Sequence, residues 1–533
     1  MRKLVRWCAA VAVASLAATD HSASAQPPAK SPIRKRTAAE DLQMFGQVLN
    51  QIRVNHPDSL DTHELLMAAI EGMVRAADPH SYVIPAMRLD PAREGQLRAG
   101  KLQPLPISFV MIGGAPVVAS VAAGTAASAL DILPGDELIS ADKKNIVAES
   151  AEELEITLAG PKNALVVLEF ERRREDGTLV RVVRSVKRER ADEATAVPAS
   201  VMLDATTGYV RLTTFMGEKV ADDLHAALER LEKAGMKQLL LDLRDNGGGS
   251  VDEAARAAGE FLPSGTVVYT ASGSKKEVLD TGRVKRSFWK SEKRYPIIVM
   301  INSGTASASE LVAGALQDHD RALVYGQPSF GKSLLMRGFP LADGSAIILV
   351  VGHINTPCGR VVQRQYRSIT TRDYYRLARA DRDTAGRPSC KTAGGRTVFG
   401  GGGIYPDVVA PRARSVPSWV ARVGEQELTL GWIGGYITAK ASSLTSLDAF
   451  LKTPTLDAAT LTDFRAFAQK QGVTIPADTI SDLTLQRLLV SSVAQAKWGD
   501  AGFYRAEALL DPEVRAATAK FADAAAYLAK SKP

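Results

Sequence analysis

The sequence predicts a multidomain α/β protein with an N-terminal helical segment, a small β-rich module, an α/β core and a helical C-terminal region. The first indication is length, because 533 residues at roughly 150 per domain suggest three or four units. The second is the alternation of strand and helix patterns between Gly208 and about Pro411, which is typical of an α/β core. The third is composition. With 45% hydrophobic and 23% charged residues, the chain is an ordinary globular protein and not a disordered, collagen-like or multi-span membrane protein.

Residues 1–25 are predicted to be a secretory signal peptide. Three basic residues precede an apolar run over 7–18, and the segment ends in the small-x-small pattern Ala23-Ser24-Ala25. The run is shorter than the ~20 residues of a membrane span, although an uncleaved membrane anchor stays open. No later stretch has the pattern of a spanning helix. We therefore expect export, most simply to a bacterial periplasm.

Residues 26–95 form the predicted N-terminal helical region, with helices over 38–55 and 61–77. Asp78-Pro79 ends the second helix, because the residue before a proline disfavours helical geometry. Residues 96–190 form the β-rich module. Its expected elements are strands at 116–121, 137–141, 164–172 and 179–187, a helical turn at 125–130 and a helix at 150–158.

Residues 191–415 form the predicted α/β core. Its expected elements are strands at 209–213, 238–243, 297–301 and 322–325 and helices at 220–233, 252–261 and 308–317. Leu239–Leu241 and Ile297–Ile301 are continuous apolar runs, as in strands buried on both faces. Residues 416–533 form a helical region, with helical patterns at 447–451, 461–471 and 483–496 and no chemistry to assign.

The charge and the cysteines narrow the possible partners and cofactors. The formal net charge is +7, and +5 without residues 1–25 (7 − 3 + 1). No dense Lys/Arg stripe with interleaved aromatic residues occurs, so no nucleic-acid partner is predicted. No Cys-x-x-Cys or His-Glu-x-x-His spacing occurs, so we expect no metal and no cofactor. Cys358 and Cys390 are the cysteines that remain once the predicted signal peptide is removed. The sequence leaves open whether they form a disulfide.

The stretch 299–310 predicts a nucleophilic serine. An apolar strand ends at Ile301, small residues follow, and a helix begins near Ala308. Ser307 at this junction would lie where free N–H groups and the helix dipole favour negative charge. The alternative is that Thr305, Ser307 or Ser309 only caps the helix.

The loop 326–332 supplies a candidate general base, Lys332. A solvated lysine has a pKa of ~10.4 and is a poor base, but burial near Phe330 and Leu334 would lower it. Residues 326–333 also match the P-loop spelling Gly-x4-Gly-Lys-Ser. We discount a phosphate site because Pro328 removes an N–H and no helical pattern follows Ser333.

A Gly-rich turn at 247–249 follows the apolar strand over 238–243. Glycine lets a backbone N–H come close to a reacting carbonyl. Gly248 and Ala308 are therefore candidate oxyanion donors, and the alternative is a plain strand-to-helix turn.

Several motifs, in order, resemble the carboxyl-terminal processing (tail-specific) proteases. They are EGMVRAADPHSY at 71–82, PVVASVAAGTAASALDILPGDELISADKKNI at 116–146, LDLRDNGGG at 241–249, TASASE at 305–310, QDHDRALVYGQPSFGK at 317–332 and GGGIYPD at 401–407. The resemblance implies a PDZ-like domain at 96–190, a crotonase-like protease core, and Ser307 and Lys332 as a catalytic pair 25 residues apart. It also implies a supporting role for Asp318 and cleavage of proteins near their C-termini. Protein or peptide substrates are the expected partners, and a homo-oligomer or an adaptor is possible.

Two positions depart from the family pattern. Met336 stands where many members have a glutamine that orients the lysine, and its thioether is only a weak acceptor. The stretch matching the carboxylate-binding loop of the PDZ domain contains Pro104 and Pro106, which supply no N–H. We assign peptide binding to Leu105, Pro106, Ile107 and Ser108.

Two alternative functions remain. Met336 and the prolines motivate a periplasmic binding or scaffold protein with impaired turnover. A Ser-His-Asp hydrolase would use His319 or His353, but no Gly-x-Ser-x-Gly pattern surrounds Ser307.

Overall fold

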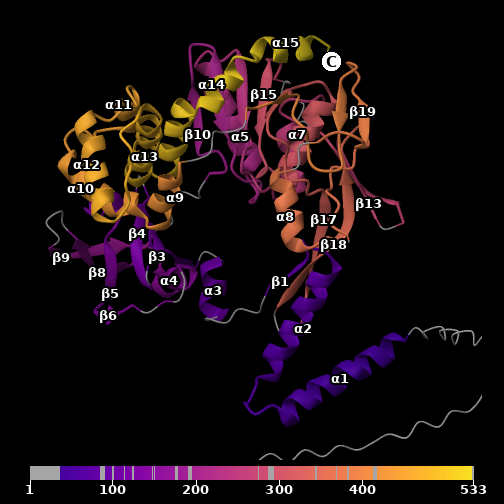
Figure 1. Cartoon of the computed structure of the whole chain (residues 1–533), viewed down its shortest axis with the longest axis horizontal. Helices are drawn as coiled ribbons and strands as arrows, with labels where there is room; N and C mark the ends of the chain where they lie inside the picture. The colour runs from indigo at the N-terminus through magenta and orange to yellow at the C-terminus, as the bar shows by residue number, and fades with distance from the viewer. Residues whose placement is uncertain are drawn as a thin grey trace, which may run out of the picture. The chain divides into compact units, whose positions relative to one another are not determined.

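The computed structural model describes most of the chain after residue 35 (Figure 1). The described residues are 36–84, 91–98, 101–112, 114–122, 125–146, 148, 151–173, 178–189, 195–273, 275–285, 293–342, 345–367, 369–380, 383–411 and 417–530. They fall into two compact units, Met1–Ile70 and Glu71–Pro533, which we describe separately. The predicted signal peptide at 1–25 lies outside the described residues. No described helix is long and apolar enough to cross a bilayer.

The described part of the first unit contains helix α1 (Ala38–Asn55) and the beginning of α2 (Thr62–Ala77). Thr37 and Glu40 begin α1 with a reciprocal cap, because the Thr37 N–H donates to Glu40 Oε2 at 2.8 Å and the Glu40 N–H donates to Thr37 Oγ1 at 3.3 Å. Both helices lie where the sequence predicts them.

The β-rich module folds around its own core within the second unit. Its main sheet has the order β3-β4-β5-β8-β9, with β6 on β5. The elements are α3 (Pro91–Arg98), β2 (Leu102–Gln103), β3 (Ile107–Ile112), β4 (Ala115–Val121), η1 (Ala126–Ala129), β5 (Glu137–Ala141), β6 (Lys144–Asn145), α4 (Ala151–Leu158), β7 (Gly160–Pro161), β8 (Leu165–Arg173) and β9 (Leu179–Lys187). Leu154 and Leu158 of α4 pack on Val118, Leu168 and Phe170 of the sheet.

The α/β core is built on a six-stranded sheet of order β10-β11-β12-β15-β16-β21, parallel except for the β10–β11 pair. The strands are β10 (Ala199–Met202), β11 (Thr207–Arg211), β12 (Gln238–Asp242), β15 (Ile297–Ile301), β16 (Leu323–Gly326) and β21 (Val408–Val409). One face packs on α5 (Val220–Lys233), α6 (Val251–Ala258) and α7 (Ala308–Asp318). Alternate residues such as Leu240 and Ile298 face the other way, as strand geometry requires. The predicted mixed α/β class is confirmed.

A second sheet, which the sequence analysis did not predict, has the order β1-β18-β13-β14 with β17 on β18. Its strands are β1 (Tyr82–Ile84), β13 (Val267–Ser272), β14 (Val278–Arg283), β17 (Leu334–Pro340) and β18 (Ala346–Asn355). Nearby lie α8 (Thr371–Ala380), β19 (Ser389–Lys391) and β20 (Thr397–Phe399). The pairing of β1 with β18 brings residues near 80 alongside residues near 350.

The C-terminal region is helical, as predicted, and part of it belongs to the core. Its helices are α9 (Ser418–Glu425), α10 (Leu428–Ala439), α11 (Leu447–Leu451), α12 (Ala458–Lys470), α13 (Thr479–Leu510), α14 (Pro512–Thr518) and α15 (Phe521–Lys530). Val514, Ala517 and Phe521 pack on the sheet face opposite α5, α6 and α7. The last helices therefore complete the layered core.

Cys358 and Cys390 form a disulfide, which answers the question that the sequence left open. The two sulfurs lie near Asp318, but bonded to each other they offer no thiolate to a metal.

Replacing both cysteines with alanine is expected to lower the free energy of unfolding by about 3 kcal/mol, because the bond closes a loop of 32 residues. Urea unfolding of the oxidised protein and the double variant measures this. A reductant should destabilise the wild type and leave the variant unchanged. Equal unfolding midpoints for reduced and oxidised wild type would contradict the prediction.

Candidate active site

The candidate site forms where three neighbouring parallel strands end. β12, β15 and β16 lead into the loops 243–250, 302–307 and 327–333. The carboxyl ends of parallel strands share one edge, the usual place for a site in an α/β sheet. The sequence-predicted residues Gly248, Ser307 and Lys332 are therefore carried by adjacent loops.

Ser307 is the N-cap of α7 and has φ 58° and ψ −120°. A side chain with positive φ is strained, and such strain clusters at functional sites. The half-buried Ser307 precedes the eleven-residue helix whose first N–H belongs to Ala308. N–H groups in a first helical turn lack intrahelical acceptors, so Ala308 offers a donor beside the serine.

The three hydroxyl residues that could have capped the helix have different surroundings in the structure. Thr305 Oγ1 donates to the Leu243 carbonyl at 2.8 Å and accepts from the Asn302 N–H at 3.0 Å. The first bond joins the loops after β12 and β15, and the second lies within the loop after β15. The Ser309 hydroxyl is buried and has no hydrogen-bond partner among the described residues. Ser307 is the N-cap residue of α7, as the capping alternative expects, and its backbone N–H donates to Glu310.

Glu310 connects Ser307 to the lysine loop. Its Oε2 accepts the backbone N–H of Ser307 and that of Lys332, each at 2.8 Å. The two backbone nitrogens are therefore no more than 5.6 Å apart (2.8 + 2.8). Its Oε1 accepts the Gly331 N–H at 2.7 Å and the Ser329 hydroxyl. One buried carboxylate thus holds the backbone of Ser307 and the loop that carries Lys332 in a common frame.

Burial of Lys332, and not the charge of Glu310, favours a neutral amine. Burial lowers the pKa of Lys332, while the charges of Glu310 and Asp78 raise it by less. Burial raises the pKa of Glu310 to about 7, although four hydrogen bonds oppose that shift. Because a lysine acts as a base only when unprotonated, its environment moves it toward a catalytic state.

His80, from the segment that the sequence analysis assigned to the N-terminal helical region, lies beside the lysine loop. Its Nε2 is 2.8 Å from the Tyr374 hydroxyl, and its ring meets Phe330 edge-on at a centroid distance of 6.3 Å. Burial, followed by the charge of Lys332, lowers the pKa of His80 to about 4. His80 is therefore neutral at ordinary pH.

Met336 lies in β17 opposite Val350, next to a bulge at Leu335. The residues after Ser333 thus form a strand, so a P-loop, which needs a helix there, does not fit this segment. The acidic groups whose charges act on Lys332 are Glu310 and Asp78.

Gly248 lies against the segment that contains Ser307. Its φ is +95°, and a Cβ there would come within 2.8 Å of Ser307 Cβ and of the Ala308 nitrogen. No larger residue fits without displacing the serine. The Gly248 N–H, however, donates to Asn246 Oδ1 at 2.9 Å. An oxyanion at this position would have to share or replace that acceptor.

The other predicted residues lie away from this cluster. Asp318 pairs with buried Arg360 and accepts the Cys358 N–H at 3.1 Å, so it anchors the disulfide segment. His319 Nε2 lies 2.8 Å from the Val267 carbonyl, and His353 lies in β18 opposite Leu334.

In the β-rich module, Leu105 and Ile107 belong to the hydrophobic core, and Pro106 is also buried. Ser108 is exposed. Leu105 and Ile107 therefore hold the module together, and only the backbone or Ser108 could meet a peptide there.

Glu310 and His80 were missed as site residues from sequence. The signal for Glu310 was present, because Ser-x-x-Glu at 307–310 is also the pattern of a capping box. His80 stands in a quoted motif, DPHSY, but its contact with the lysine loop depends on the tertiary fold.

Comparison with known proteins identifies similar chains. Residues 206–372 match the family model described as peptidase family S41. A carboxy-terminal-processing protease of Bartonella bacilliformis is 31% identical over 329 residues, which cover 61% of this chain and 73% of the relative. A carboxyl-terminal-processing protease of Synechocystis is 33% identical over 242 residues, covering 44% and 53%. Among solved structures, a photosystem II D1 C-terminal processing protease is 22% identical, with 69% and 87% covered and a TM-score of 0.33.

Proposed function

Because this chain belongs to the carboxyl-terminal-processing proteases of peptidase family S41, we propose that it is a serine endopeptidase with Ser307 as nucleophile and Lys332 as general base. The neutral Lys332 amine takes the Ser307 hydroxyl proton as Oγ attacks the scissile carbonyl. The protonated lysine then returns a proton to the leaving amine, and water releases the acyl group by the reverse sequence.

The observation that carries this proposal is the Glu310 carboxylate, which accepts N–H groups from both Ser307 and Lys332. A protein with no turnover has no need to hold the two groups in one frame. The positive φ of Ser307 supports the same conclusion, because a strained backbone is maintained only by surrounding structure that fixes it.

We further propose that the N–H of Ala308 is the main oxyanion donor. It heads α7, where the helix dipole favours a developing negative charge. Gly248 is the proposed second donor. Its N–H would leave Asn246 Oδ1, its present acceptor, and donate to the oxyanion instead. The small size of Gly248 keeps this space open.

The substrates we propose are protein tails. The β-rich module would act as a PDZ-like domain that binds an extended peptide along β3, the end strand of its sheet order, with Ser108 exposed there. With residues 1–25 as a signal peptide, the enzyme would act outside the cytoplasm. A homo-oligomer or an adaptor remains a possible partner.

Cleavage of an unfolded protein by the purified mature chain tests the proposal. Peptide products that depend on Ser307 support an endopeptidase. Binding of the substrate without any product would favour the scaffold alternative instead.

Activity is expected to rise with pH. The reactive form of Lys332 is the neutral amine, and burial lowers its pKa below the ordinary 10.5. The logarithm of kcat/KM should therefore increase with pH and level off below the ordinary lysine range. His80, with a pKa of about 4, cannot supply this rise. Initial rates on a peptide without titratable side chains measure the profile, and an acid optimum would exclude a lysine base.

A further inference from the structure

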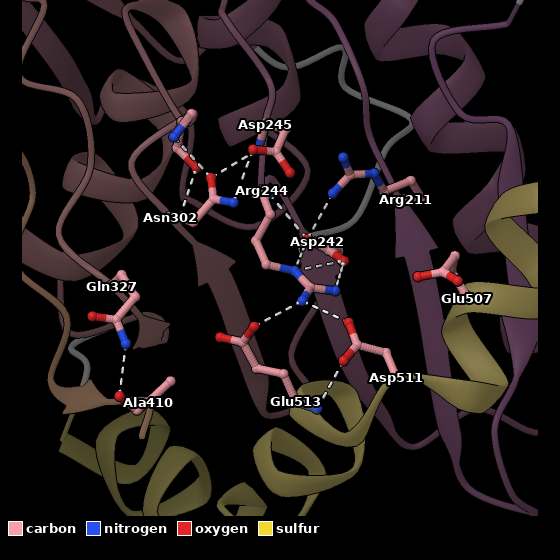
Figure 2. A network of polar contacts seen from close by, with 12 residues as sticks. Arg211, Asp242, Arg244, Asp245, Asn302, Gln327, Ala410, Glu507, Asp511 and Glu513 are labelled. Atoms are coloured by element: carbon pink, nitrogen blue, oxygen red, sulfur yellow. Dashed lines mark hydrogen bonds and ion pairs between the residues drawn. The ribbon is translucent and has the colours of Figure 1, made fainter. Parts of the chain in front are cut away.

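Arg244 follows β12 and binds carboxylates from two parts of the chain (Figure 2). One carboxylate is on β12 itself, and the others are in the C-terminal region. Arg244 Nη2 donates to Asp242 Oδ2 at 2.7 Å. Its Nη1 donates to Asp511 Oδ2 at 2.7 Å and to Glu513 Oε2 at 2.9 Å. Asp511 and Glu513 begin α14, so the C-terminal region reaches the strand that leads into the candidate site.

The core by itself does not balance the charges around Asp242. Asp242 is buried between two guanidinium groups, because Arg211 Nη1 also donates to it at 2.8 Å. Burial raises the pKa of Asp242, but Arg244 and Arg211 lower it to about 2, so it is ionised. Two cations thus face one anion, and a buried charge left without its partners is strongly unfavourable. Asp511 and Glu513 give Arg244 further anionic partners, and Asp511 also faces a third cation, Arg487.

The C-terminal region also contacts the other arginine of this cluster. The Arg211 guanidinium lies 5.1 Å from the centre of the Tyr504 ring on α13, within the range of a cation–π interaction. Arg487 of α13 lies 3.4 Å from Asp511 and pairs with Glu507. Asp511 is therefore also held by a side chain of α13, the helix that precedes it.

Only a short loop separates Arg244 from the nucleophile. The Asp245 N–H donates to Asn302 Oδ1 at 2.9 Å, and the Asn246 carbonyl accepts the Ala306 N–H at 2.9 Å. Gly248, four residues after Arg244, lies against Ser307. A shift of Arg244 would therefore pass directly to the loop that borders the serine and the proposed oxyanion position.

We propose that the C-terminal region is a positioning element of the protease site, in which Asp511 and Glu513 hold Arg244 and, through it, the loop 245–249 beside Ser307. The inference rests on the proposed protease function. The proposal gives a role to residues 416–533, in which the sequence analysis found no candidate functional residue.

The variant D511N/E513Q tests this proposal with little change in shape. Asp511 is the N-cap of α14, and asparagine caps a helix as well as aspartate does, so the charges are lost while the cap is kept. We expect kcat on a short peptide to fall about tenfold, because small misplacements near reacting groups cost large factors in rate. KM should change less than about twofold, since the peptide-binding surface is untouched. The control is D523N, at an exposed carboxylate of α15.

Amide hydrogen exchange gives a readout that does not depend on activity. In D511N/E513Q, amides of 245–249 should exchange faster, while those of β15 and α7 keep their protection and show that the core is folded. The milder E513Q, at a side chain that is 30% exposed, should give a smaller change in the same direction. Unchanged kcat and unchanged exchange, or an equal effect in D523N, would overturn the inference. An inactive wild type whose loop exchange still responds would overturn the proposed function, while the coupling of Asp511 and Glu513 to the loop 245–249 would stand.

Discussion

Ser307→Ala is expected to lower kcat/KM for a peptide substrate by about 10⁴- to 10⁶-fold, because no other group can form the acyl intermediate. Lys332→Ala should produce a loss of similar order. The double variant should be little worse than either single one, since residues that act as one unit are not additive. Initial rates on a fluorogenic peptide, with active-site titration of the wild type, measure these values.

Matched control variants distinguish the loss of a catalytic group from a general disturbance of the fold. Lys332→Arg keeps the positive charge but cannot act as a base, because a guanidinium does not deprotonate in proteins. It should be as inactive as Lys332→Ala. Ser309→Ala removes a buried hydroxyl that has no partner among the described residues and should leave the rate unchanged. Ser307→Ala or Lys332→Arg with near-normal turnover would remove the proposed dyad.

Local patterns were sufficient to predict most elements. Helices at 38–55 and 220–233 and the strand at 297–301 were predicted with the bounds that the structure shows. The strand, for example, is a continuous apolar run bounded by polar and small residues, which is a local signal. Ser307 and Lys332 were predicted from motifs that resemble those of the family. They remain a proposed pair, but the structure brings their backbones together.

The rest depended on contacts between distant segments. The strands of the second sheet have partly exposed patterns, and β1 pairs with residues more than 260 positions further along the chain. Arg244 and Asp511 are 267 residues apart, so nothing in the local sequence joins them. Glu310 was overlooked for a related reason. An acidic residue in a first helical turn is explained by capping alone, and its bonds to Gly331 and Lys332 arise only in the fold.

Glu310→Gln is expected to reduce kcat/KM by about 10²-fold and the free energy of unfolding by about 2 kcal/mol. Of the four groups that donate to Glu310, only the Ser329 hydroxyl can also accept. A glutamine can turn its NH₂ toward Ser329, but that NH₂ then faces the Gly331 N–H. One buried donor is left without an acceptor, which costs about 1–3 kcal/mol, and the loop that carries Lys332 loses an attachment. Peptide rates and urea unfolding measure the two effects, with exposed Glu155→Gln as the control.

The pH dependence of the unfolding free energy tests whether the Glu310 carboxyl has a raised pKa in the folded protein. Burial raises the pKa of the folded carboxyl from 4.5 to about 7. Between these values the folded protein retains a proton that the unfolded chain has lost, so the Glu310 contribution to stability decreases as pH rises through this window. Glu310→Gln cannot titrate, and its unfolding free energy should vary less with pH between 4.5 and 7 than that of the wild type. Parallel curves would mean that the Glu310 carboxyl titrates at its ordinary pKa. The Ser307 and Lys332 N–H groups would then donate to a carboxylate that is ionised near neutral pH. Because its negative charge raises the pKa of Lys332, it would oppose deprotonation of the lysine.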